Sequence, residues 1–136
     1  MANSSEYRIE HDLMGAMRVP KDAYYGVQTL RAVENFPISG HRVDSEMIVA
    51  IAQIKKAAAM LNANDNQIPL SVGKAICQAC DEIIDGKLHD QFLVDSIQGG
   101  AGTSMNMNAN EVIANRAIEI LGGTKGDYTV DIPTIT

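Results

Sequence analysis

The pattern of apolar positions predicts a long helix in the middle of the chain. From Ser45 onward, apolar residues recur in steps of four and three, which is the spacing of positions that share one helix face. These residues are Met47, Ile51, Ile54, Ala58 and Leu61. Ser45 is placed as the N-cap, and the asparagines within 62–66 end the element. The five apolar residues are therefore expected to line one face of this helix.

Two further helices follow from the same spacing. One is predicted from Ser71 to about Asp85, where Gly86 stops it, and the other from 103–105 to about Leu121, where two glycines break it. Their apolar stripes are Val72, Ile76, Cys80 and Ile83 in the first, and Ala109, Ile113, Ala117 and Ile120 in the second. The segment 90–97 between them is expected to be extended or a loop.

The first 44 residues show a different pattern. Short extended segments at 7–10 and 17–20 predict a small hairpin that turns through Met14-Gly15. A short helix is expected within 22–33, a loop at 36–40, and a strand at 128–130 near the other end. The chain is therefore predicted to be mainly α, with a small β-hairpin near the N-terminus.

Composition supports one soluble helical domain. The 136 residues are 46% hydrophobic but only 4% aromatic, with seven Met and no Trp, so Ala, Ile, Leu, Val and Met must build the core. A net charge of −6 argues against nucleic acid or an anionic membrane as a partner. The first eight residues are too polar for a signal peptide, and no apolar run is long enough to span a membrane. A cytoplasmic location is expected.

The run from Gln98 to Glu111 carries the candidate chemistry. Three glycines in four positions precede Thr103 and Ser104, either of which could cap the following helix. A helix start offers unpaired N–H groups and partial positive charge, which suit a carboxylate or phosphate. Asn106 and Asn110 lie one turn apart and should share a face. The run indicates either polar recognition of a small anion or simply a loop that ends in a helix cap.

The remaining candidates are weaker. Cys77 and Cys80 form a C-x-x-C motif without a second pair, and their helical context favours two buried thiols over a redox or metal site. Three histidines are scattered, and the Lys55-Lys56 pair is interpreted as part of a solvated helix face. No metal site and no cofactor is predicted.

The glycine and asparagine run resembles the first of three motif regions in the aspartase/fumarase superfamily, nearly residue for residue over 98–115. Further segments match that family in order, so the resemblance covers almost the whole chain; they are 8–15, 19–20, 23–29, 34–36, 55–58, 79–82 and 90–92. Gly99–Thr103 and Tyr25-Gly26 resemble the ammonia-lyase branch, since fumarate hydratases typically carry Thr-Gly-Ser-Gly-Thr and Trp-Gly at these places.

The resemblance implies that residues 1–136 are the N-terminal helical domain of an enzyme that reversibly eliminates ammonia from L-aspartate to give fumarate. It implies that Thr103 contacts the substrate carboxylate and that Ser104 and Asn106 line the same pocket. It further implies self-association, because family members are homotetramers in which three subunits build each active site.

The chain departs from the family in its length. The second motif region, and the third with its mobile Gly-Ser-Ser loop and serine base, are missing from this sequence. After Tyr128 only the proline of the usual Asn-Pro-Asn-Asp-like turn is kept. We therefore expect no catalytic residue in this chain and negligible activity from it alone. The alternatives are a class II fumarate hydratase domain and a free-standing helical assembly module.

Overall fold

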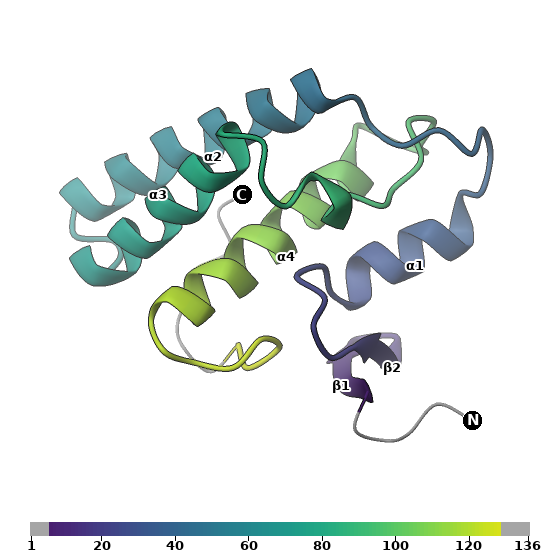
Figure 1. Ribbon diagram of the computed structural model, residues 1–136, viewed down its shortest axis with the longest axis horizontal. Helices are drawn as coiled ribbons and strands as arrows, with labels where there is room; N and C mark the ends of the chain where they lie inside the picture. The colour runs from purple at the N-terminus through teal and green to yellow at the C-terminus, as the bar shows by residue number, and fades with distance from the viewer. Residues whose placement is uncertain (1–5, 129–136) are drawn as a thin grey trace.

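The computed structural model describes residues 6–128, which form four α-helices beside a two-stranded hairpin (Figure 1). The elements are β1 (Tyr7–Asp12), β2 (Gly15–Pro20), α1 (Val27–Asn35), α2 (Ser45–Asn64), α3 (Leu70–Ile84), the 3-10 turn η2 (His89–Gln91) and α4 (Thr103–Ile120). The mainly α fold with a small N-terminal hairpin is thus confirmed. Of the strand expected at 128–130, Tyr128 lies in a turn and the other two residues lie outside the described part.

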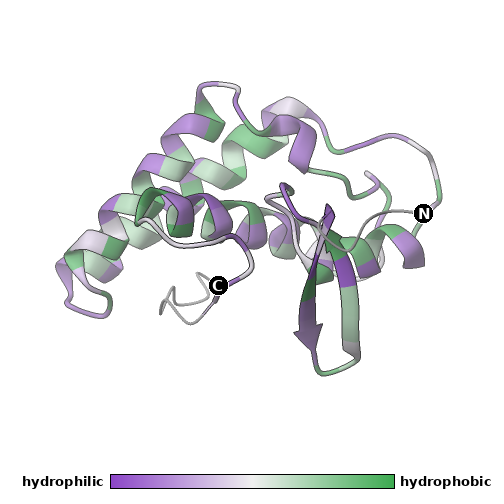
Figure 2. Ribbon diagram, turned by 60° about the horizontal axis from the view of Figure 1, so that its bottom comes forward, coloured by the Kyte–Doolittle hydropathy of each residue, from purple (hydrophilic) through white to green (hydrophobic). Residues whose placement is uncertain are grey.

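The helices form a layered arrangement around α4. α2 and α3 lie side by side, α3 packs on α4, and α1 lies along the first part of α4 (Figure 1). The hairpin contacts α1 and projects away from the helices (Figure 2). α4 is therefore the element that joins the α2–α3 pair to the N-terminal segment.

The hairpin forms where the alternation of residues predicted it. β1 and β2 are antiparallel, with Tyr7 opposite Pro20 and Asp12 opposite Gly15. Gly15 has φ of 122°, a conformation that side chains disfavour. The Asp12 carboxylate accepts a hydrogen bond from the Met14 N–H at 2.9 Å, which closes the turn.

The stripes predicted for α3 and α4 form the core. All four α3 residues of the stripe are buried, as are the first three of α4, whereas Ile120 is half-buried. α2 and α3 approach closely at Gly73, where a Cβ would lie 2.7 Å from the Ala63 Cβ. Gly86 and Gly122 follow the two helices with φ of 97° and 87°, as expected of glycines that end helices.

The face predicted for α2 is wrong by one position. Its buried residues are Ile48, Ala52, Lys55 and Ala59. In contrast, Met47, Ile54 and Leu61 are 55%, 66% and 64% exposed. Both sets step by four and three residues, so periodicity alone could not choose between two apolar faces of one helix. The N-cap is Asp44 rather than Ser45, and its side chain makes no capping hydrogen bond.

No described helix combines the length and the apolar character needed to cross a membrane.

Candidate functional site

The glycine run turns the chain into the start of α4. Gly100 and Gly102 have φ of 75° and 82°, in the left-handed region that favours glycine. Gly102 is the N-cap, and no side chain caps the helix from that position. The expectation that Thr103 or Ser104 would be the cap is wrong, because the positive φ of Gly102 brings Thr103 directly into helical conformation. Both hydroxyl residues are instead the first residues of the helix.

Gln98 holds this helix start in place from the preceding loop. Its side-chain oxygen accepts the Met105 N–H at 3.0 Å, and its amide nitrogen donates to the Asp95 carbonyl at 2.9 Å. Within residues 6–128, no hydrogen bond satisfies the N–H groups of Thr103 and Ser104. These two N–H groups and two hydroxyls remain available to a ligand.

Asp95 fastens the same loop to the segment that follows α1. Its carboxylate accepts hydrogen bonds from the Ser39 hydroxyl at 2.6 Å, the Ser39 N–H at 2.8 Å and the Gly40 N–H at 2.9 Å. The Ile97 N–H donates to it as well, at 2.8 Å. The hydrogen bond from the Ser39 side chain is the main reason why the pKa of Asp95 lies well below its usual range. Asp95 therefore ties the loop that precedes the glycine run to residues 39–40 after α1.

Thr103 and Ser104 open onto a groove of about 760 Å³ between α4, α1 and the hairpin turn. Its other lining residues are His11, Asp12, Leu13, Met14, Gln28, Arg31, Ala32, Asn35, Phe36 and Met107. Arg31 makes two hydrogen bonds to the Asp12 carboxylate, at 2.7 and 2.8 Å. These bonds lower the pKa of Asp12, so the two groups neutralise each other. The start of α4 is then a main source of positive potential in the groove.

Asn106 faces away from this groove. Its side-chain oxygen accepts a hydrogen bond from the Lys55 Nζ at 2.6 Å, and it does not line the groove with Thr103 and Ser104. Lys55 is only 4% exposed, and burial lowers its pKa. The interpretation of Lys55 as solvated is therefore wrong, while Lys56 is half-buried and pairs with Asp81 at 2.6 Å.

Asn108, and Asn115 further along the helix, tie α4 to loops. Asn108 is buried, accepts the Leu93 N–H and donates to the Gln91 carbonyl, both at 3.0 Å. Asn115 donates to the Tyr24 carbonyl at 2.7 Å and accepts the Gly126 N–H at 2.8 Å. These two asparagines therefore serve the fold rather than ligand recognition, because their side chains satisfy buried backbone groups.

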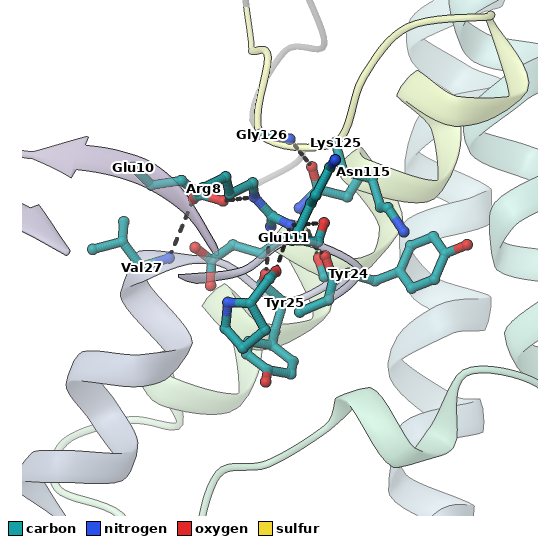
Figure 3. A network of polar contacts seen from close by, with 12 residues as sticks. Arg8, Glu10, Tyr24, Tyr25, Val27, Glu111, Asn115, Lys125 and Gly126 are labelled. Carbon is teal, nitrogen blue, oxygen red and sulfur yellow. Dashed lines mark hydrogen bonds and ion pairs between the residues drawn. The ribbon is translucent and has the colours of Figure 1, made fainter. Parts of the chain in front are cut away.

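A buried polar network beside the groove holds the N-terminus of α1 (Figure 3). Glu111 of α4 accepts hydrogen bonds from the Gln28 N–H at 3.0 Å, the Thr29 N–H at 2.8 Å and the Thr29 hydroxyl at 2.7 Å. Glu10 of β1 accepts the Val27 N–H at 3.3 Å. Two distant carboxylates therefore cap α1 in place of a local residue.

Gly26 is required at this point by space rather than by φ. A Cβ there would collide with the Glu111 carboxylate and lie 2.6 Å from a Glu10 oxygen. The sequence motif Tyr25-Gly26 thus has a structural reason, since the backbone must pass between two acidic side chains.

The Glu111 carboxylate makes the stability of the chain depend on pH. Burial raises the pKa of Glu111 above the ordinary 4.5. Its contribution to the free energy of unfolding is therefore fully present below pH 4.5 and is lost as pH rises through the folded-state pKa. We expect the stability of the wild type relative to Glu111→Gln to fall over this range in urea titrations followed by circular dichroism. The control is Glu34→Gln, an exposed substitution on α1, the helix that Glu111 caps; a stability difference for Glu111→Gln that does not change with pH would contradict the prediction.

Neither of the two cysteines lines the groove. Cys80 is buried, which raises its pKa to about 12, and Cys77 is half-buried rather than fully buried as expected. Among residues 6–128, no three His, Cys, Asp or Glu side chains are grouped so that they could hold a metal ion. Of the histidines, only His11 lines the groove.

Two residues were missed by sequence reasoning. Glu111 could not be found by spacing, because its partners lie 82 and 83 positions away in the chain. Lys55 did carry a signal, since it continues the steps of four, three and four that link Ile48, Ala52 and Ala59.

Comparison with known proteins agrees with the resemblance found in the motifs. A family model described as Lyase matches residues 15–132. Aspartate ammonia-lyase from Bacillus subtilis (strain 168) is 61% identical over 123 residues, which are 90% of this chain and 26% of that protein. Aspartate ammonia-lyase from Escherichia coli (strain K12) is 54% identical over 128 residues, or 92% of this chain and 27% of that protein. The chain thus spans about a quarter of the length of these relatives.

Solved structures show the same fold. The crystal structure of fumarate lyase:delta crystallin from Brucella melitensis in native form has a TM-score of 0.92 at 52% identity, over 95% of this chain and 31% of that one. Recombinant class II fumarase from Schistosoma mansoni has a TM-score of 0.83 at 33% identity, over 88% of this chain and 26% of that one. With a family model matched over most of its length, the chain belongs to the lyase family, and it is similar to the N-terminal part of aspartate ammonia-lyases.

Proposed function

We propose that this chain is the N-terminal part of an aspartate ammonia-lyase and supplies part of the site for the substrate carboxylate. The observation that carries the proposal is the start of α4, where two hydroxyls and two N–H groups without partners among the described residues open onto one groove. Thr103 and Ser104 are the binding residues of this proposal. The family resemblance also implies Asn106 for this site, but its side-chain oxygen accepts a hydrogen bond from the buried Lys55 Nζ and the residue does not line the groove.

The chemistry of ammonia elimination fits such a site. A base removes the proton from the carbon beside the side-chain carboxylate of L-aspartate, and that carboxylate gains negative charge as the aci-carboxylate forms. Fixed hydrogen-bond donors stabilise charge that develops in the transition state, because they need no reorganisation when it appears. The elimination then releases ammonia and leaves fumarate. In this scheme the chain binds and orients the carboxylate, and the base comes from another part of the enzyme.

The relatives support an ammonia-lyase over a fumarate hydratase. Aspartate ammonia-lyases reach 53–61% identity with this chain, whereas the class II fumarase structure is 33% identical. The proposal includes a cytoplasmic enzyme that works as a homotetramer on L-aspartate and fumarate, as the family resemblance implies.

The purified chain is expected to produce no fumarate from L-aspartate, because a general base must lie within hydrogen-bond reach of its proton and none is assigned here. A chimera tests the positive half of the proposal: residues 6–128 replace the matching segment of the Bacillus subtilis relative. We expect this chimera to form fumarate, measured by ultraviolet absorbance, at a rate close to that of the relative. A folded chimera without turnover, or turnover by the isolated chain, would refute the proposal.

A further inference from the structure

Lys55 is a buried basic residue at the contact between α2 and α4. It shares the buried face of α2 with Ile48, Ala52 and Ala59, which are all apolar. Lysine is rarely buried to this degree, because its charged amine loses hydration there, and the same effect lowers the pKa of Lys55. Packing alone would be served better by an apolar side chain at this place. The amine therefore calls for a reason other than core packing.

The hydrogen bond of Lys55 leads directly to the start of α4. Its Nζ donates to the side-chain oxygen of Asn106 at 2.6 Å. The backbone N–H of Asn106 donates in turn to the carbonyl of Gly102, the N-cap of α4, at 3.1 Å. Asn106 lies one helical turn beyond Thr103, about 4.5 Å along the axis at 1.5 Å per residue. Lys55 thus ties the first turn of α4 to α2.

The first turn of α4 is held from two separate segments. Gln98 accepts the Met105 N–H from the preceding loop at 3.0 Å, and Lys55 binds the next residue from α2. Thr103 and Ser104 belong to this same turn and line the groove. Neither Lys55 nor Asn106 lines it. Any effect of these two residues on a ligand in the groove must therefore pass through the position of the helix turn.

We propose that Lys55, through Asn106, positions the first turn of α4 for binding the substrate carboxylate. This inference rests on the function proposed above. Hydrogen-bond donors stabilise a developing charge best when they are fixed in advance, and a small displacement of such groups can cost about 10²-fold in rate. Because the extra charge on the carboxylate appears in the transition state, the effect is expected mainly in kcat rather than in KM.

Lys55→Met in the chimera described above tests this positioning role. Methionine fills much of the same buried space but cannot donate a hydrogen bond to Asn106. We expect kcat for L-aspartate to fall by about 10–10²-fold, with a smaller change in KM. The urea midpoint of the 136-residue chain should not fall, because the substitution removes a buried amine and leaves only a half-buried amide behind. A purely structural role would lower the midpoint and spare kcat of the folded enzyme.

Two further variants make the test specific. Lys56→Met is the matched control, since Lys56 is the neighbouring lysine and pairs with Asp81 of α3 at 2.6 Å; it should leave kcat unchanged. Asn106→Ala should lower kcat as much as Lys55→Met does. The double variant should be no slower than either single variant, because both substitutions remove the same hydrogen bond. Asn106→Ala also decides the question if Lys55→Met does not fold.

Thr103→Ala separates this inference from the proposed function. If Thr103→Ala lowers kcat/KM while folded Lys55→Met and Asn106→Ala lower kcat no more than Lys56→Met, the positioning role is wrong and the proposed function stands. Losses that simply add in the double variant would also overturn the positioning role. If Thr103→Ala has no effect, the carboxylate site and the positioning role are both refuted.

Discussion

Thr103→Ala in the chimera is expected to lower kcat/KM for L-aspartate by about 10²–10³-fold, the usual cost of losing one donor to a developing oxyanion. Thr103 is the first residue of α4, exposed, and lines the groove together with Ser104. Its hydroxyl makes no hydrogen bond to another described side chain that the fold would lose. The substitution should therefore change catalysis without changing stability.

Steady-state kinetics of the chimera, with fumarate absorbance as the readout, measures this effect. Thr103→Ser keeps the hydroxyl and should recover most of the activity. Thr124→Ala removes an exposed threonine from the loop after α4 and should leave kcat/KM unchanged. If Thr103→Ala costs no more than Thr124→Ala, the start of α4 is not part of the carboxylate site, and the proposed function loses the observation that carries it.

Helical periodicity predicted the buried face correctly for helices that are apolar on only one side. The four stripe residues predicted for α3 and three of the four predicted for α4 are buried, whereas the buried Asn108, Glu111 and Asn115 of α4 lie outside the predicted stripe. α2 is apolar on two sides, and its buried side is set by α3 and α4, which lie far along the chain. The one-residue shift in α2 is thus a consequence of tertiary packing rather than of local preference.

Some features of the candidate site are also local and could be predicted from sequence, whereas others depend on tertiary contacts and could not. The glycine run predicted the helix start at 103–105, because helix beginnings are local properties, although the cap is Gly102 rather than Thr103 or Ser104. The wall of the groove could not be predicted, since it depends on Asp12 binding Arg31 and on Glu111 capping α1. Such charged pairs bridge segments whose separation in sequence carries no signal of contact.

The segment that leads into the groove wall depends on one guanidinium group. Arg8 of β1 donates to the carbonyls of Pro20, Lys21, Ala23 and Tyr25 at 2.7–3.1 Å. Its Nε also donates to the Glu10 carboxylate at 2.7 Å, and the two side chains are 12% and 2% exposed (Figure 3). A planar group with five donors can serve these acceptors at once, whereas a lysine ammonium cannot.

Arg8→Met is expected to destabilise the chain by about 3–5 kcal/mol, because it leaves the Glu10 carboxylate buried without its cation. Arg8→Lys keeps the charge but not the planar fork, so its loss should be intermediate. The midpoint of urea unfolding, followed by circular dichroism, measures both changes.

Arg18→Met provides the matched control, since Arg18 is an exposed arginine on the partner strand β2. A surface substitution of this kind should shift the free energy of unfolding by no more than about 0.5 kcal/mol. A loss from Arg8→Met no larger than that of Arg18→Met would mean that loop 20–25 holds its shape without the guanidinium. A large loss would show that the guanidinium of Arg8 and its carbonyl acceptors hold loop 20–25, which leads into the start of α1.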